Sequence, residues 1–196
     1  MFSGGRTMKQ AKTLSATELK RVIAVVRAGR HKKRNELAVL LSYYAGLRVK
    51  EIASLKHSDV FDSNGGVKRI VALRAEQTKG STGRIIVLND KLAQALTQLV
   101  QRSTNKNYCD LALIRSQKGA AFSANSLCQL FGRIYATAGI DGASSHSGRR
   151  TFITNLAHKG VSAKVLMTLA GHQHMSTTQR YIDVNDEMLK AAVELA

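Results

Sequence analysis

Apolar side chains recur every three to four residues over most of the chain, which is the spacing of one face of an α-helix. Ser15 and Glu18 predict the start of the first helix, because each side chain can bind an unpaired backbone N–H there. Gly29 predicts its end. The stretch 36–45 is apolar nearly all round, so we expect it to form a central, buried helix.

The second half of the chain shows the same helical spacing. Asn89 and Ser123 are placed to cap two further helices, since their short polar side chains can accept from the first free N–H groups. The region 146–170 predicts two helices broken at Gly160, and a short helix is expected at 177–181. A last helix carries an apolar stripe formed by Met188, Leu189, Ala192 and Val193.

Strand patterns are confined to one region. The β-branched runs 67–73 and 84–88 flank the polar, glycine-containing stretch 76–83, which predicts a hairpin. The turn sequence at 62–66 suggests that 59–62 supplies a third, short strand. The predicted fold class is therefore mainly α, with one small three-stranded antiparallel sheet.

The amino-acid composition indicates what kind of partner the chain binds. The chain has 196 residues, 44% of them hydrophobic, which is enough for one domain with its own core. Lys and Arg total 30 against 13 Asp and Glu, a net charge of +17, so a polyanion such as nucleic acid is the first partner to consider. We expect a flexible basic tail over 1–12 and a single domain over 13–196.

Several classes of protein are disfavoured by the sequence. It contains no long uncharged apolar stretch and no apolar signal core, so we expect no membrane partner and a cytoplasmic location. Cys109 and Cys128 have no metal-like spacing. His172 and His174 could be combined with another histidine into a zinc site, but no zinc-type spacing supports this. No metal and no cofactor is therefore expected.

Six polar residues carry the functional prediction, and their order along the chain matters. Taken singly, each has an ordinary explanation as a helix-end, solvated or packing residue. Together they form AGLR-x-x-E at 45–51, TKG at 78–80, HSGRR at 146–150, AGH at 170–172 and a tyrosine nine residues later. This order resembles the catalytic domain of the tyrosine recombinases, the phage integrase family. The residues concerned are Arg48, Lys79, His146, Arg149, His172 and Tyr181.

The resemblance implies a site-specific recombinase that cuts and rejoins DNA through a 3′-phosphotyrosyl intermediate. Tyr181 would be the nucleophile. Arg48 and Arg149 would clamp the scissile phosphate, because a guanidinium offers a planar fork of donors. His172 would donate to a non-bridging oxygen of the phosphate.

The remaining roles also follow from the resemblance. Lys79 would protonate the departing 5′-oxygen, and His146 would assist proton transfer from the tyrosine. Glu51 is expected to orient the cluster without touching the phosphate. Further contacts to DNA are expected from Arg84, Arg150 and Arg180.

Two residues of the box around Arg149 depart from the family pattern, which usually has Leu before this arginine and His after it. Gly148 and Arg150 occupy those places, and the glycine is expected to loosen Arg149. No part of this sequence resembles the separate N-terminal DNA-binding domain of the family. We therefore expect a short, single-domain recombinase, or else an excised catalytic domain, of bacterial, phage or plasmid origin.

Double-stranded DNA is the predicted partner, and self-association into dimers or tetramers on DNA is expected. Accessory DNA-bending or directionality proteins are further candidate partners. The C-terminal helix at 185–195 could dock on a neighbouring protomer or pack on its own core, and the sequence leaves both open. Two other functions also remain open: a non-catalytic DNA-binding protein of the same fold, and a type IB topoisomerase, which shares the chemistry.

Overall fold

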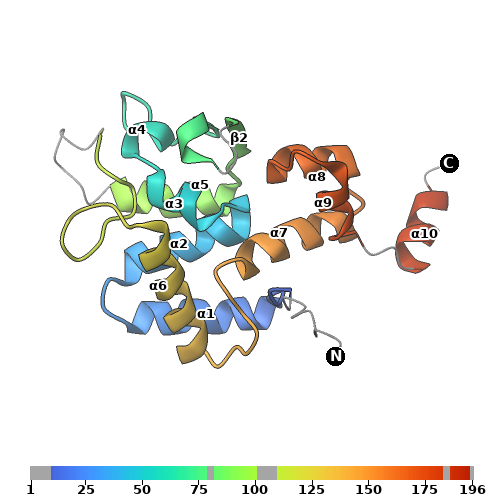
Figure 1. The fold of residues 1–196 in the computed structure, drawn as a ribbon, viewed down its shortest axis with the longest axis horizontal. Coiled ribbons are helices and arrows are strands. Elements are labelled where there is room, and N and C mark those ends of the chain that lie inside the picture. Colours follow the sequence, from blue (N-terminus) through green and yellow to red (C-terminus); the bar gives the residue numbers. More distant parts are fainter. Residues whose placement is uncertain (1–9, 79–81, 101–109, 183–185, 195–196) are drawn as a thin grey trace, which may run out of the picture.

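The computed structural model describes residues 10–78, 82–100, 110–182 and 186–194 (Figure 1). It shows a helical domain with one small antiparallel sheet. Most of the predicted tail, residues 1–9, and the hairpin tip with Lys79 lie outside the described residues. The elements are α1 (Ala16–Ala28), α2 (Lys32–Ala45), α3 (Val49–Ser54), α4 (His57–Val60), β1 (Ile70–Leu73), a 3-10 turn η1 (Ala75–Gln77), β2 (Arg84–Val87), α5 (Asp90–Val100), α6 (Ala124–Thr137), α7 (Ser147–His158), α8 (Ala163–Ala170), α9 (Met175–Gln179) and α10 (Asp186–Val193).

The predicted caps at the start of the helices are confirmed. At α1 the Glu18 N–H donates to the Ser15 hydroxyl (3.1 Å), and the Ser15 N–H donates to the Glu18 carboxylate (2.9 Å). The Asn89 side chain accepts from the Leu92 N–H at α5, and Ser123 caps α6 in the same way. These side chains satisfy N–H groups that the helix itself leaves without a partner.

Helix α2 is the central helix, as predicted. It packs against α1, α3, α5 and α7, and Leu37, Val39 and Leu41 on it are almost completely buried. The helix begins at Lys32, four residues earlier than the apolar run, and it ends at Gly46, whose φ of +61° favours glycine. The next residues, Leu47 and Arg48, turn directly into the candidate site.

The prediction of a third strand is wrong. β1 and β2 pair antiparallel, from Ile70 opposite Val87 to Leu73 opposite Arg84, and they form a two-stranded sheet among the described residues. Asp59 belongs to α4. The Asp62 carboxylate accepts from the backbone N–H groups that follow it, which closes a tight turn and leaves one isolated bridge between residues 61 and 67.

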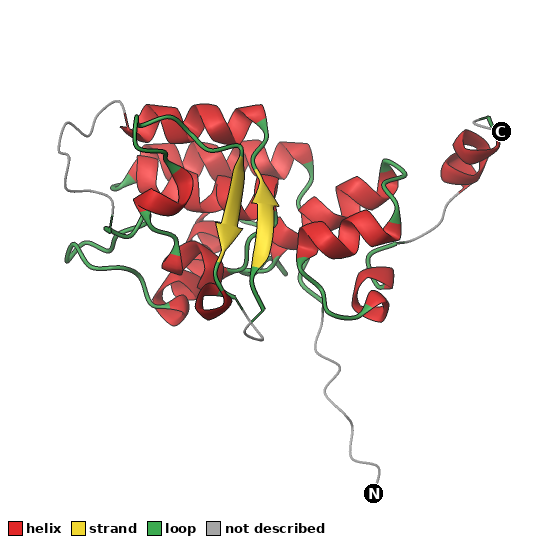
Figure 2. Cartoon of the chain, turned by 90° about the horizontal axis from the view of Figure 1, so that it is seen from above, coloured by secondary structure: helices red, strands yellow, loops and turns green. Residues whose placement is uncertain are grey.

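The C-terminal helices complete the domain. The predicted break at Gly160 separates α7 from α8, and the sheet lies between the N-terminal helices and the α7–α9 group (Figure 2). In both views α10 stands apart from the rest of the ribbon. On α10, the side chains of Leu189 and Val193 are 56% and 73% exposed.

Candidate active site

A buried carboxylate organises the first part of the candidate site. Glu51 on α3 is completely buried. Both of its oxygens accept from the Arg84 guanidinium (3.0 and 2.8 Å), and they also accept from the side chain and the backbone N–H of Arg48 (3.0 and 2.7 Å). Burial raises the pKa of Glu51, but the two arginines outweigh burial and lower this pKa below its ordinary value. The expected role of Glu51 in orienting the cluster fits these contacts.

Three guanidinium groups converge on the C-terminal end of α8. The last carbonyls of a helix have no N–H partner within it and carry partial negative charge, so they attract cations. Each guanidinium donates to a different one of three consecutive carbonyls. The pairs are Arg84 with Leu169 (2.6 Å), Arg149 with Ala170 (2.6 Å) and Arg48 with Gly171 (3.3 Å).

Arg149 is the most deeply buried of the three. It is 5% exposed, and its second donor binds the Gly46 carbonyl at 2.7 Å. Burial, followed by the positive charges of Arg48 and Arg84, lowers the pKa of Arg149 to about 9, so this guanidinium stays protonated at pH 7. Arg48 and Arg84 share the Glu51 carboxylate, whereas Arg149 binds only carbonyls, so the cluster holds a surplus of positive charge.

Helix packing explains why a glycine precedes Arg149. A Cβ atom on Gly148 would lie 2.6 Å from the Ser42 hydroxyl oxygen on α2, so a side chain at this position would push α7 away from α2. Gly148 thus permits the close approach of the two helices. Arg149 is held by two short hydrogen bonds, and the expected loosening is not seen.

His172 and Tyr181 lie face to face beside the arginines. Their rings are stacked with centroids 5.8 Å apart and planes 24° apart. Burial, followed by the charges of Arg149, Arg48 and Arg84, lowers the pKa of His172 to about 4, so the imidazole is neutral at pH 7. Its Nδ1 lies 3.0 Å from the Thr178 hydroxyl oxygen. When that hydroxyl donates to Nδ1, Nε2 keeps its hydrogen and can donate to an anion.

The pKa of His172 leads to a prediction about stability. Because this pKa is about 4 in the folded protein and about 6.5 in an unfolded chain, the unfolded state binds more protons between these values. Stability is therefore lost as the pH falls from about 6.5 towards 4. We expect the melting temperature of His172→Gln to fall less over this range than that of the unaltered protein, as measured by circular dichroism. Parallel curves for the two proteins would contradict this assignment.

A hollow of about 380 Å³ opens beside these rings. It is lined by most of the predicted residues that lie outside the cluster of three arginines. Arg149 lines it, together with side chains from the chain segment before α1, from α7 and from the end of α9. The polar groups include Gln10, His146, Arg150, Arg180 and Tyr181. We call it the active-site hollow.

The structure therefore brings together five of the six predicted residues, namely Arg48, His146, Arg149, His172 and Tyr181. Lys79 lies outside the described residues. Arg180 is exposed, as a contact to DNA requires, but the Arg84 side chain is 6% exposed and bound to Glu51. This placement argues against the predicted DNA contact of Arg84.

Sequence reasoning missed two contributors to the site. One is the row of carbonyls at the end of α8, for which only AGH at 170–172 gave a signal. The other is Thr178, which is completely buried and faces His172. It belongs to the motif STTQRY, so its position three residues before the tyrosine could have suggested a link between the two rings.

Comparison with known proteins identifies the family of this chain. The model of the phage integrase family matches residues 12–188, and the chain belongs to this family. The tyrosine recombinase XerA of Thermococcus kodakarensis is 32% identical over 185 residues, which cover 94% of this chain and 62% of that protein. XerA of Pyrococcus furiosus is 30% identical with the same coverage.

Solved structures show the same fold. A crystal structure of XerA recombinase superposes with a TM-score of 0.72 at 24% identity, over 99% of this chain and 66% of that one. The Tn1549 transposon integrase in complex with transposon right end DNA gives 0.74 at 19% identity, over 96% and 66%. The fold is thus that of the tyrosine recombinases. The chain spans less than two thirds of the length of these relatives.

Two other features are absent from the part of the chain that the structure describes. No helix there is long and apolar enough to cross a membrane. Nor does this part bring together three or more His, Cys, Asp or Glu side chains in a group that could hold a metal ion.

Proposed function

We propose that this chain is a catalytic unit of a site-specific DNA recombinase, which cleaves and rejoins DNA strands through Tyr181. The observation that carries the proposal is the surplus of buried positive charge next to a phenol. Two guanidiniums bind the Glu51 carboxylate, the third, Arg149, binds backbone carbonyls, and Tyr181 stacks on the neutral His172 beside them. An anion held at the arginines would lie within reach of both rings, and a DNA phosphate is the anion that the net charge of +17 favours.

The proposed reaction exchanges one phosphodiester bond for another. The Tyr181 oxygen attacks the phosphorus, its proton leaves towards His146, and the bond from phosphorus to the 5′-oxygen breaks. Arg48 and Arg149 stabilise the charge that builds up on the phosphate oxygens, because both are fixed in advance by carbonyl contacts. In the family pattern, Lys79 supplies the proton for the departing oxygen. Attack of a 5′-hydroxyl on the phosphotyrosine reverses the step and joins the strands.

Capture of the covalent intermediate tests this function. Suicide substrates, in which a nick near the cleavage site lets the short fragment with the free 5′-hydroxyl diffuse away, trap the phosphotyrosyl adduct. Such substrates tiled over the genetic neighbourhood of the coding sequence should yield an adduct at a defined site. Relaxation of plasmids without any specific site would instead identify a type IB topoisomerase. Tight DNA binding with no adduct on any substrate would identify a non-catalytic binding protein.

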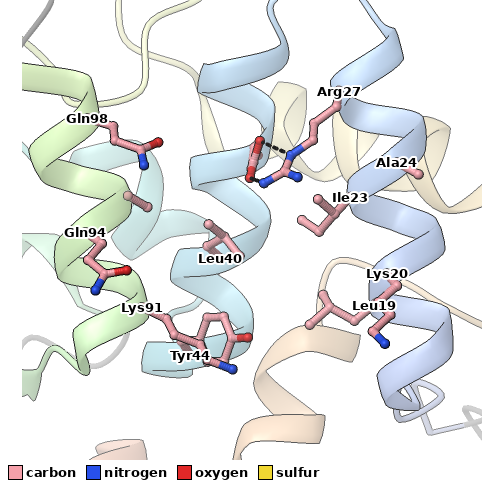
Figure 3. Close-up of a pocket in the computed structure, with 12 residues that line it drawn as sticks. Leu19, Lys20, Ile23, Ala24, Arg27, Leu40, Tyr44, Lys91, Gln94 and Gln98 are labelled. Carbon is pink, nitrogen blue, oxygen red and sulfur yellow. Dashed lines mark hydrogen bonds and ion pairs between the residues drawn. The ribbon is translucent and has the colours of Figure 1, made fainter.

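We further propose that copies of the chain assemble on DNA through α10, and that α10 docks on a neighbouring copy. The ribbon of α10 stands apart from the rest of the domain in both views, and the helix exposes Leu189 and Val193. A groove of about 440 Å³ between α1, α2 and α5 offers an apolar floor of matching character, with Leu19, Ile23 and Leu40 in it (Figure 3).

Charge supports the match between α10 and this groove. Its rim carries Lys20 and Lys91, whereas α10 begins with Asp186 and is followed by Glu194. Opposite charges on the two surfaces favour docking of this acidic helix in the groove. Docking would bury apolar side chains that otherwise face water.

Deleting residues 184–196 is expected to abolish multimers on DNA, as measured by native gel shift, while the melting temperature of the monomer stays within about 2 °C, because α10 contributes little to the core of its own domain. The matched variant Lys20→Glu/Lys91→Glu should also block assembly, and Asp186→Lys/Glu194→Lys in the same chain should restore it. A deletion that unfolds the monomer would show instead that α10 belongs to its own core.

A further inference from the structure

The ring of Tyr181 has a second neighbour besides His172. The guanidinium carbon of Arg150 lies over the Tyr181 ring, 5.7 Å from its centroid. This distance is within the range of an attractive cation–π contact. The phenol is thus in contact with an imidazole stacked 5.8 Å away and with a guanidinium above its ring.

The position of Arg150 on α7 explains why its side chain points in a different direction from that of Arg149. Consecutive residues of a helix point about 100° apart. Arg149 therefore enters the domain towards Gly46 and Ala170, while Arg150 faces the active-site hollow. The Arg150 guanidinium also donates to the side-chain oxygen of Gln10, from the segment before α1. Arg150 is thus fixed from a second side.

The backbone at Tyr181 does little to fix the orientation of the ring, so the contacts with His172 and Arg150 matter. The residue follows α9, a helix of only five residues, and its N–H donates to the Thr178 carbonyl (3.0 Å) as the last turn closes. A ring at the end of so short a helix is oriented mainly by what its faces touch. A nucleophile needs such orientation, because a misplacement of about 1 Å can cost a large factor in rate.

We infer that Arg150 is a positioning residue for Tyr181, which holds the phenol ring through a cation–π contact and keeps its oxygen directed at the phosphate. This role rests on the proposed function. It differs from the DNA contact predicted from the sequence, since the guanidinium lies over a ring and is anchored by Gln10. In this chain Arg150 stands where the family usually has a histidine, another planar side chain.

The first experiment separates orientation from DNA binding. Cleavage of a suicide substrate is followed at saturating DNA, and the dissociation constant is measured separately. Arg150→Ala should lower the cleavage rate roughly 2- to 30-fold, which corresponds to the usual strength of a cation–π contact, with a smaller change in affinity and an unchanged melting temperature. Arg133→Ala removes the same charge from an exposed position on α6 and serves as the matched control.

Two conservative variants sharpen this test. Arg150→Lys keeps the cation that a cation–π contact needs, whereas Arg150→Gln keeps a polar side chain without the charge. We expect the lysine variant to cleave at saturating DNA closer to the normal rate than the glutamine variant. Equal rates for the two variants, or a loss of affinity with a normal rate at saturation, would assign Arg150 to DNA binding and overturn the inference.

The second experiment does not depend on cleavage. 3-Fluorotyrosine is introduced at position 181, and its ¹⁹F resonance is recorded without DNA. Arg150→Ala should shift or broaden this signal, because the ring loses one of its two contacts, and Arg133→Ala should leave it unchanged. An unchanged signal in Arg150→Ala would overturn the inference. A shifted signal in a protein that forms no adduct would leave the contact in place and reject the proposed function instead.

Discussion

Tyr181→Phe is expected to lose every covalent protein–DNA adduct while folding and DNA binding persist. The substitution removes one oxygen atom and keeps the ring, so the contacts of the ring with His172 and Arg150 remain possible. Phenylalanine has no group that can attack phosphorus, and the loss should be complete and not partial. Denaturing gels with end-labelled suicide substrate measure the adduct, and gel shifts measure binding.

Tyr43→Phe is the matched control for this experiment. It removes the same atom from a half-buried tyrosine on α2 whose ring packs edge-on against Tyr44, outside the residues that line the active-site hollow. This variant should form adducts at the normal rate. An adduct that survives in Tyr181→Phe would show that another residue attacks the phosphate.

The helices of this fold were predictable because their signals are local. A cap such as Ser15, Asn89 or Ser123 acts on N–H groups within three residues of itself, so the sequence pattern and the observed contact involve the same few positions. The third strand failed for a related reason. The choice between strand and turn at 59–66 depends on what one side chain binds, and the Asp62 carboxylate binds two backbone N–H groups of the turn.

The composition of the site was predictable from the order of its motifs, but its geometry was not. That three guanidiniums bind three successive carbonyls depends on how β2 and the start of α3 approach the end of α8, and both are far from α8 in the sequence. The close approach at Gly171 belongs to the same packing, since a Cβ atom there would lie 2.3 Å from the Arg84 side chain. Short-range sequence patterns contain no information about such distances.

The position of Arg84 on β2 shows which sequence signal could have predicted its burial. It precedes the buried Ile86 by two residues on β2, so both side chains point to the inner face of the sheet. A cation directed inwards must find a carboxylate, because burying it alone is very costly. Glu51, the one acidic residue in the predicted motifs, was the available partner. The alternation of the strand therefore favoured a buried ion pair over a contact with DNA.

Arg149→Lys is expected to lower the cleavage rate roughly 100-fold or more while DNA affinity changes much less, because a lysine loses one or two charge-assisted hydrogen bonds of about 1.5–3 kcal/mol each. The guanidinium uses one nitrogen on Gly46 and the other on Ala170, and the hydrogens left over remain for the phosphate. A lysine keeps the charge, but its single nitrogen cannot span both carbonyls and also present a planar pair of donors.

The measurement is the cleavage rate at saturating DNA, together with the melting temperature. Arg133→Lys, the same exchange at an exposed position on α6, controls for the substitution itself and should leave the rate unchanged. The melting temperature of Arg149→Lys should also fall, because one of the two buried carbonyls loses its donor. A normal cleavage rate in Arg149→Lys would mean that another basic residue neutralises the phosphate, and Arg150 on the next face of α7 would be the first candidate.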